Sequence, residues 1–299
     1  MKKTLLIISA IFTLSACTEK MRIKTQEGDQ LVGVSASITD EYKKQEVIIS
    51  RTEPFYGGQP EMISNATVFI RDGILNANLD TIWQDTIWFE ESEKPGYYYS
   101  VNEIAGQMEH VYHLSIDFAD EDGNHHFYSK SKMNINVEQI DSIRIKPWKF
   151  NSLEVKNYLG VYPYFLTCED KNVTYMARVR INDGLVGGDT LTKCEVFNAM
   201  DFAGIYFNGP LMVMIAGEFP VYGLNQRDSL EVVHVGDTVT MDLWSIPTNY
   251  ALYIMEIAAS TGTNPMMGTP SNVRTNISPE DKAVGFFHAS SIRQCSVIY

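Results

Sequence analysis

The fold is decided by the segment His110–Lys130, which reads HVYHLSIDFADEDGNHHFYSK. Hydrophobic and polar residues alternate in His110–Phe118 and again in His125–Lys130, on either side of the polar run Asp120–Asn124. Alternation with a period of two predicts β-strands, and a short Asp/Gly/Asn run between two strands predicts a tight turn. We therefore expect an antiparallel hairpin in which Gly123 supplies a positive φ.

Similar strand patterns precede this hairpin at short intervals, with turn residues between them. The expected strands are residues 31–40, 46–51, 66–71, 81–89 and 97–99. Pro54–Pro60 is expected to be a loop, and Asp72-Gly73 a turn that ends the third strand. No helical period interrupts this series, which is typical of an antiparallel β-sandwich.

The strand pattern restarts after Lys132 and continues to the end of the sequence. The expected strands are residues 140–145, 161–167, 173–181, 193–197, 211–216, 230–234, 238–243 and 283–290. One helix is expected at Asn249–Ser260, where a hydrophobic stripe recurs with the helical period, Asn249 can cap the start and Gly262 can follow the end. The sequence predicts an all-β protein of two β-sandwich-like domains, residues 31–136 and 137–299, with one short helix in the second.

The N-terminus has the pattern of a bacterial lipoprotein signal. Two lysines precede the apolar run Leu5–Ala16, which is too short to span a bilayer, and Leu14–Cys17 (LSAC) matches a lipobox. We expect residues 1–16 to be removed, Cys17 to carry the lipid, and the polar residues 17–30 to form a tether. An ordinary secretory signal with a chance cysteine is the alternative.

Charge limits the partners of the chain. It carries 37 acidic and 24 basic side chains, a formal net charge of −13. An acidic surface argues against binding to nucleic acid and against peripheral attachment to an anionic membrane surface. The expected membrane anchor is therefore the N-terminal lipid alone.

Three cysteines remain besides Cys17. Cys168 and Cys194 are the expected disulfide pair, because an exported protein folds in a compartment that permits disulfides. Cys295 is then left as a free thiol. A three-cysteine metal site is less favoured, since the sequence contains no C-x-x-C spacing.

Four histidines near the decisive hairpin raise the question of a zinc site. His110 and His113, and likewise His125 and His126, point to opposite faces of their strands. A hairpin that turns near Asp122-Gly123 also places His113 opposite roughly Lys132 rather than His125. We therefore expect solvated histidines and no metal, and we interpret Asp120–Asn124 as a turn rather than a calcium loop.

Catalytic motifs are missing from the sequence, which contains no G-x-S-x-G, H-E-x-x-H or P-loop pattern. We expect no catalytic residues, no cofactor and no enzyme activity, although a pair of glycosidase carboxylates cannot be recognised from sequence. Three segments are candidates for ligand binding or for ordinary packing: Tyr97–Tyr99, Tyr158–Phe165 and the long loop Asn264–Asn276.

Several short motifs, taken in order, resemble a known family. They include the lipobox, Ala66–Ile70, Tyr112–Ile116, Gly236–Val239, Pro270–Val273 and Gly285–Phe287. The chain resembles the domain-of-unknown-function 4249 family (DUF4249) of Bacteroidota over nearly its whole length. It departs from the family at Pro279–Lys282, where members often have a glycine-rich segment.

The resemblance implies an outer-membrane lipoprotein whose first domain is Ig-like or transthyretin-like, and it implies no catalytic residues. It also implies association with TonB-dependent transporters. We therefore expect a non-enzymatic accessory or ligand-capturing subunit of an outer-membrane uptake system. The periplasmic face and the cell surface are both alternatives for its location. The alternatives are a surface adhesive or structural protein and a cell-surface hydrolase.

Overall fold

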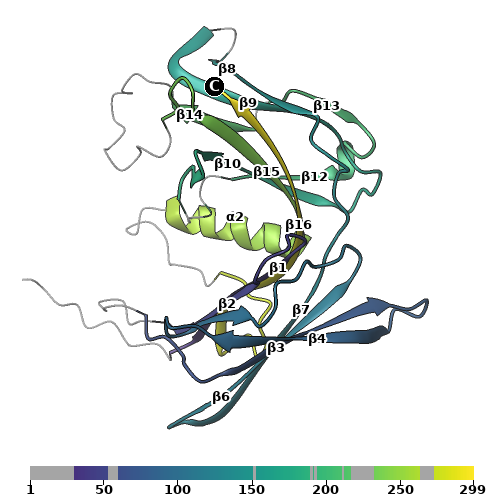
Figure 1. Cartoon of the computed structure of the whole chain (residues 1–299), viewed down its shortest axis with the longest axis vertical. Helices are drawn as coiled ribbons and strands as arrows, with labels where there is room; N and C mark the ends of the chain where they lie inside the picture. Colours follow the sequence, from purple (N-terminus) through teal and green to yellow (C-terminus); the bar gives the residue numbers. More distant parts are fainter. Residues whose placement is uncertain are drawn as a thin grey trace, which may run out of the picture.

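A computed structural model describes residues 30–52, 60–150, 153–188, 191, 194–210, 212–216, 232–262 and 273–299. Strands dominate, and the expected all-β, sandwich-like fold is confirmed (Figure 1). Seven strands form the N-terminal half: β1 Val32–Thr39, β2 Glu46–Arg51, β3 Thr67–Leu75, β4 Thr81–Glu91, β5 Tyr97–Ser100, β6 Val111–Asp120 and β7 Gly123–Lys132.

The C-terminal half contains the other strands and the helix α2. Its elements are β8 Ser142–Phe150, β9 Leu153–Leu166, β10 Thr174–Ile181, β11 Gly184–Leu185, β12 Glu195–Asn198, the 3-10 turn Ala199–Asp201, β13 Tyr206–Asn208, β14 Val213–Ala216, β15 Thr238–Ile246, α2 Thr248–Gly262 and β16 Ala283–Ile298. No helix among the described residues has the length and apolar character needed to cross a membrane.

One large sheet runs through both halves in the order β11-β10-β15-β16-β1-β2-β5-β4-β3-β6-β7, and β12 pairs with β10. A second sheet has the order β13-β9-β14, with β8 also paired to β9. The long strand β16 holds the large sheet together. Its first part, Ala283–Ser290, pairs in parallel with β1, and its second part, Ser291–Ile298, pairs antiparallel with β15.

The first core lies where the N-terminal part of the large sheet curls over itself. Alternate residues of each strand point inward, among them Ile38, Ile70, Leu114 and Phe287, and each of these is fully buried. The backbone N–H of Ala289 on β16 donates to Ser131 Oγ on β7 at 2.9 Å, so β16 also faces the far edge of the sheet. This arrangement is a β-sandwich with one solvent-facing surface on each side.

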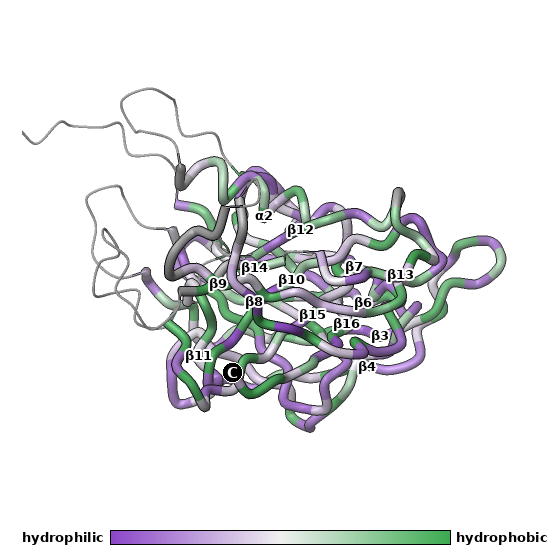
Figure 2. The backbone as a smooth tube through the Cα atoms, turned by 90° about the horizontal axis from the view of Figure 1, so that it is seen from above, coloured by the Kyte–Doolittle hydropathy of each residue, from purple (hydrophilic) through white to green (hydrophobic). Residues whose placement is uncertain are grey.

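The second core lies between β10, β15 and the end of β16 on one side and the second sheet on the other. Val161 and Phe165 on β9 meet Tyr175 on β10 and Leu243 on β15. Hydrophobic and hydrophilic residues alternate along these strands (Figure 2). The boundary between residues 136 and 137 stays a prediction, and β16 contributes residues to both cores.

The decisive hairpin forms as expected between β6 and β7, and Gly123 has a φ of 122°. Its register differs from the expected one by two residues, because His113 faces Lys130 rather than Lys132. The turn expected at Asp72-Gly73 is wrong. Those residues lie inside β3 at a β-bulge against β4, and the chain turns instead at Asn76–Asp80.

The helix α2 occupies the expected place, but the expected stripe is buried only in part. That stripe comprised Ala251, Leu252, Ile254, Met255, Ala258 and Ala259. Tyr250, Ala251 and Ile254 face the protein, whereas Leu252 and Met255 of the expected stripe are exposed. The sequence reasoning also missed the first part of β9 and the short strands β11 and β13. Of the strand expected at 230–234, residues 232–234 are described and form no strand, and residues 230–231 lie outside the described residues.

Candidate functional site

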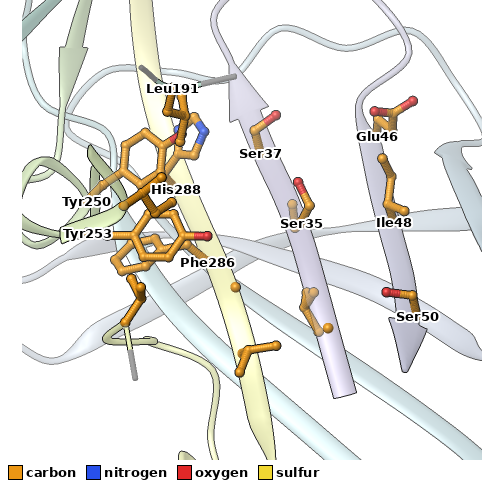
Figure 3. A pocket seen from close by; sticks show the side chains of 17 residues that line it. Ser35, Ser37, Glu46, Ile48, Ser50, Leu191, Tyr250, Tyr253, Phe286 and His288 are labelled. Atoms are coloured by element: carbon orange, nitrogen blue, oxygen red, sulfur yellow. The ribbon is translucent and has the colours of Figure 1, made fainter. Parts of the chain in front are cut away.

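A pocket lies between α2 and the surface of the large sheet that faces away from the first core (Figure 3). Its floor is the outward-pointing set of β1, Gly33, Ser35 and Ser37, whose neighbours in sequence fill the core. Because successive side chains of a strand alternate between the two faces, the same strand builds the core and the pocket. Small side chains on the outward set leave space above the sheet.

The polar side of the pocket comes from β1 and the neighbouring strand β2. Ser50 and Glu46 on β2 lie beside Ser35 and Ser37, with Ile48 between them (Figure 3). The hydroxyl of Tyr99 on β5 donates to Glu46 Oε2 at 2.6 Å. This hydrogen bond to a carboxylate raises the pKa of Tyr99, and it holds the carboxylate of Glu46 at the rim.

The opposite side of the pocket is aromatic. Tyr250 and Tyr253 come from α2, and Phe286 and His288 come from β16. Tyr250 stacks on His288 with ring centroids 4.0 Å apart and stacks on Tyr253 at 5.9 Å, while Tyr253 packs on Phe286 at 5.1 Å. Figure 3 shows these rings gathered on one side and the serines and Glu46 on the other.

His288 is buried beneath this wall, and its Nδ1 lies 2.8 Å from Ser290 Oγ. Burial lowers the pKa of His288 to about 3, because a charged imidazole loses its hydration there. Burial also raises the pKa of Tyr250. Both rings are therefore neutral at pH 7, and the aromatic wall carries no charge.

Two glycines allow the strands beneath the pocket to lie close together. Gly285 on β16 has a φ of 95°, and a Cβ at this position would lie 2.0 Å from the carbonyl oxygen of Val34 on β1. A Cβ on Gly33 would lie 2.9 Å from Ser50 Oγ. Larger residues at either position would push the strands apart or fill the pocket floor.

The pocket has a volume of about 550 Å³, and Leu191, Ile257 and Val273 complete its apolar side. This volume is typical of sites for small molecules, which combine an apolar wall with a few polar groups that fix orientation. Among the lining residues that the structure describes, Glu46 is the one carboxylate. The arrangement supports binding of a neutral molecule with one flat apolar face and hydrogen-bonding groups on its opposite edge.

The structure keeps the four histidines of the hairpin region apart. His110 bonds Asp72 at 2.7 Å, His125 bonds Asp120 at 2.8 Å, and His126 bonds Asp117 at 2.7 Å, while His113 stacks on Tyr128. Within the described ranges, no three His, Cys, Asp or Glu side chains are grouped so that they could hold a metal ion.

The expected disulfide between Cys168 and Cys194 is not formed, and both thiols and that of Cys295 are free. Cys168 precedes β10 and contacts Tyr175, whereas Cys194 precedes β12, which pairs antiparallel with β10. Cys168 packs against the second core, whereas Cys194 packs against the cluster that contains Tyr250, Ile254 and Phe286 beneath α2. The two cysteines therefore belong to different hydrophobic clusters.

The aromatic segments have mixed roles. Tyr98 is buried in the first core, while Tyr97 and Tyr99 point to the other face, as the alternation predicts. Phe165 is buried in the second core and Tyr164 bonds Lys146 on the surface of the second sheet. Residues 264–272 of the expected binding loop lie outside the described residues, and so does Cys17.

Sequence reasoning missed most of the pocket. Its residues lie on β1, β2, β16 and α2, and no two of these segments except β1 and β2 are close in sequence. The available signals were the small outward-pointing residues Gly33, Ser35 and Ser37 and the i, i+3 tyrosines Tyr250 and Tyr253. Neither signal shows which other segment it faces.

The fold and the site together define an all-β protein with two sandwich-like cores that share the strand β16. A pocket with one aromatic side lies beneath the helix α2. Residues 18–296 match the family described as "Domain of unknown function (DUF4249)". The chain belongs to this family, which confirms that part of the resemblance.

Other comparisons add little. No curated protein matches the chain. The chain is similar to a crystal structure of Parabacteroides merdae β-glucuronidase, with 6% identity and a TM-score of 0.22, over 72% of this chain and 23% of that one. A second structure of that enzyme, with glycerol in its active site, gives 7% identity and a TM-score of 0.21 over the same shares. The chain thus spans about a quarter of the length of these enzymes, and a likeness this slight carries no argument.

Proposed function

We propose that this protein is a non-enzymatic binding protein that holds a small neutral ligand between α2 and the large sheet. The observation that carries the proposal is the division of the pocket into an aromatic wall and a polar side. A ligand ring can pack on Tyr253 and Phe286 while its hydroxyl or amide groups bond Ser35, Ser37 and Glu46. Charge argues against an anionic ligand, because Glu46 repels anions and the aromatic wall supplies no positive charge.

The sequence supports a wider setting for this binding. The lipobox at Leu14–Cys17 supports export and lipid attachment at Cys17, with the described domains held beside an outer membrane. In that setting the protein captures a ligand as an accessory subunit of a TonB-dependent uptake system. The absence of catalytic motifs from the sequence is consistent with a role in binding rather than reaction.

The ligand test uses the protein expressed without residues 1–16 and a panel of neutral mono- and disaccharides and nucleosides, assayed by calorimetry. We expect at least one member to bind, and Tyr253→Ala to weaken it about tenfold, since one stacked ring contributes about 1 kcal/mol or more. Tyr42→Ala is the matched control, because Tyr42 is exposed and lies outside the pocket. Binding that both variants leave unchanged, or no binding at all, would contradict the proposal.

The proposed lipid attachment and the proposed association with a transporter are tested separately in a native host. Cys17→Ala should move the protein from the membrane fraction to the soluble fraction, and unchanged fractionation would contradict lipid attachment. A tagged full chain extracted in mild detergent should bring down a TonB-dependent transporter in stoichiometric amount, as identified by mass spectrometry. Recovery of the protein alone would argue against the accessory role and leave ligand binding to be judged by the first test.

A further inference from the structure

A second surface of the molecule has the features of a binding site, and it lies at the end of the large sheet that β7 closes. The strands β4, β3, β6 and β7 are neighbours in that order, at the end of the molecule opposite β8 and β9 (Figure 1). Their inward residues fill the first core. Their outward residues include Arg71, Trp83, Trp88, His113, Tyr128 and Lys130, which we call the aromatic–cationic face.

Register places these side chains in two rows across the four strands. Trp88 pairs with Phe69, Phe69 with Ser115, and Ser115 with Tyr128, which makes the first row. Four strands at about 4.8 Å spacing give a row roughly 14 Å long. Trp88 is 53% exposed and Tyr128 is 44% exposed, so their rings are available to a ligand.

The second row carries positive charge. Arg71 pairs with His113, and His113 with Lys130. The guanidinium carbon of Arg71 lies 4.7 Å from the ring centre of Trp83, whose indole packs over Gly73 in the bulge of β3. Within the part of the chain that the structure describes, Nε of Arg71 and Nδ1 of His113 are buried and have no hydrogen-bond partner.

The second row places Arg71 and Lys130 close together on a chain that is acidic as a whole. Burial, and after it the positive charge of Arg71 with those of Lys130 and His126, lowers the pKa of His113. A chain with a net charge of −13 therefore presents a positive patch among exposed rings. Such a patch attracts anionic groups, and an anion beside Arg71 would bond its guanidinium.

We propose that the aromatic–cationic face binds a carbohydrate chain that carries carboxylate or sulfate groups. The C–H faces of successive sugar rings pack on Trp88, Phe69 and Tyr128, and the acidic groups bond Arg71 and Lys130. This chemistry uses both rows at once. It also differs from that of the pocket beneath α2, which favours a neutral ligand.

Two other occupants fit the face less well. A protein partner usually buries aliphatic side chains as well, but these rings are interleaved with arginine, histidine, lysine and threonine. A membrane surface would have to reach the hairpin at Asn76–Asp80, next to Trp83. The pairings of β1, β2, β5, β4 and β3 run antiparallel in turn, so this hairpin lies at the end of the sheet opposite the start of β1, to which the proposed tether would be joined.

The test measures binding of three oligosaccharide probes by tryptophan fluorescence and calorimetry. The probes are oligogalacturonate, its uncharged methyl ester and a sulfated dextran oligosaccharide. We expect at least one acidic probe to bind, the methyl ester to bind about tenfold more weakly than oligogalacturonate if the carboxylate is preferred, and added salt to weaken acidic binding. Arg71→Gln and Trp88→Ala should each weaken it about tenfold.

Lys94→Gln is the matched control, because Lys94 lies over the ring of Tyr97, 3.5 Å from its centre, in a cation–π pair away from this face. The affinity of Lys94→Gln for the acidic probes should stay within about twofold of that of the wild type. Failure of both acidic probes to bind, or equal losses in Arg71→Gln and Lys94→Gln, would overturn the proposal. Sedimentation with anionic vesicles that depends on Trp88 would overturn it in favour of a membrane.

The comparison of probes needs no variant, so the proposal stays testable if Trp88→Ala does not fold. Tyr253→Ala separates this face from the pocket, since it should leave acidic binding unchanged. Loss of acidic binding in Tyr253→Ala would place that binding in the pocket and overturn the assignment to the aromatic–cationic face.

Discussion

Single residues set the geometry of the pocket, and Gly285 does so most directly. Its positive φ and its contact with the backbone of Val34 leave no room for a side chain. Backbone strain and a steric clash therefore act together at one point of the parallel β1–β16 pair. Any substitution there affects the strand contact on which the pocket floor rests.

We predict that Gly285→Ala lowers the free energy of unfolding by about 3 kcal/mol or more, from strain and overpacking combined. Gly236→Ala is the matched control, because Gly236 has a φ of 98° but open space around it. Gly236→Ala should lower the free energy of unfolding only by the cost of backbone strain, about 1–2 kcal/mol. Urea unfolding of both variants measures the difference, and equal losses would contradict the close contact at Val34.

His288 makes the stability of the fold depend on pH. Its pKa is lowered to about 3 in the folded protein, against about 6.5 in the unfolded chain. Below pH 6.5 the unfolded chain binds a proton that the folded protein does not, so stability falls as the pH drops from 6.5 towards 3. Each pH unit in this window costs about 1.4 kcal/mol.

We therefore expect about 2 kcal/mol of stability to be lost between pH 6.5 and pH 5. His288→Phe keeps a stacking ring on Tyr250 and should flatten most of this dependence. Burial also lowers the pKa of His113, which adds a smaller contribution of the same sign. The exposed His126 serves as a control in His126→Asn, and urea unfolding at several pH values gives the slopes. An unchanged slope in His288→Phe would contradict the buried neutral imidazole.

At the scale of elements, α2 shows how a surface helix forms one side of a pocket. Tyr250, Ala251 and Ile254 pack on Met176, Ile246 and Phe286 and fix the helix above the sheet. Tyr253 and Ile257, on the neighbouring side of the helix, face the pocket. The buried residues of α2 therefore fix the position of Tyr253 in the aromatic wall.

We predict that Ile254→Ala lowers the free energy of unfolding by about 2–4 kcal/mol, because the side chain is 2% exposed and leaves a cavity. Met255→Ala, one residue further and 58% exposed, should change stability by less than about 0.5 kcal/mol. Thermal unfolding of the two variants checks this. Similar losses would mean that α2 is rotated relative to the structure described.

The elements themselves were largely predictable from sequence, for a local reason. The alternation in His110–Lys130 depends only on residues near one another, and it predicted β6, β7 and the turn at Gly123. Asp72-Gly73 misled because the same dipeptide serves a turn or a bulge. What distinguishes them is the pairing of β3 with β4, which continues past Gly73 and places Ile82 and Trp83 against it. The burial expected for Leu252 and Met255 of α2 was wrong for a similar reason. A stripe of small and large hydrophobic residues does not show which side of the helix contacts the sheet.

At the scale of the whole molecule, the two sandwiches are joined by β16. Asp40, which follows β1, accepts from the backbone N–H of Ile292 at 2.7 Å and pairs with Arg293 at 2.8 Å. Asn136 donates to the carbonyls of Ser291 and Leu243 at the same junction. The point where β16 passes from β1 to β15 is thus bonded to both halves of the chain.

We predict that the two cores unfold together. Ile292→Pro removes the N–H that Asp40 accepts and should accelerate hydrogen exchange in both β1 and β10. Ile298→Pro, at the exposed end of β16, should affect neither strand. Exchange measured by mass spectrometry distinguishes the outcomes, and protection lost on one side alone would show that the sandwiches are independent.

The site was less predictable than the strands, and distance along the chain explains why. Val32 pairs in parallel with Ala283, and no local pattern indicates that contact. The pocket and the aromatic–cationic face both depend on such pairings. The cysteines illustrate the same point, because only the tertiary packing shows that Cys168 and Cys194 belong to different hydrophobic clusters.

The position of β16 in the sequence has a consequence for how the protein is made. During synthesis β1 leaves the ribosome long before the strand that will lie beside it. Until then its edge stays open, and neither sandwich can close. The export that we propose from the lipobox would suit this delay, because a chain that crosses a membrane unfolded pairs its strands only afterwards. Its β1 edge would have to be shielded there until Ala283–Ile298 arrives.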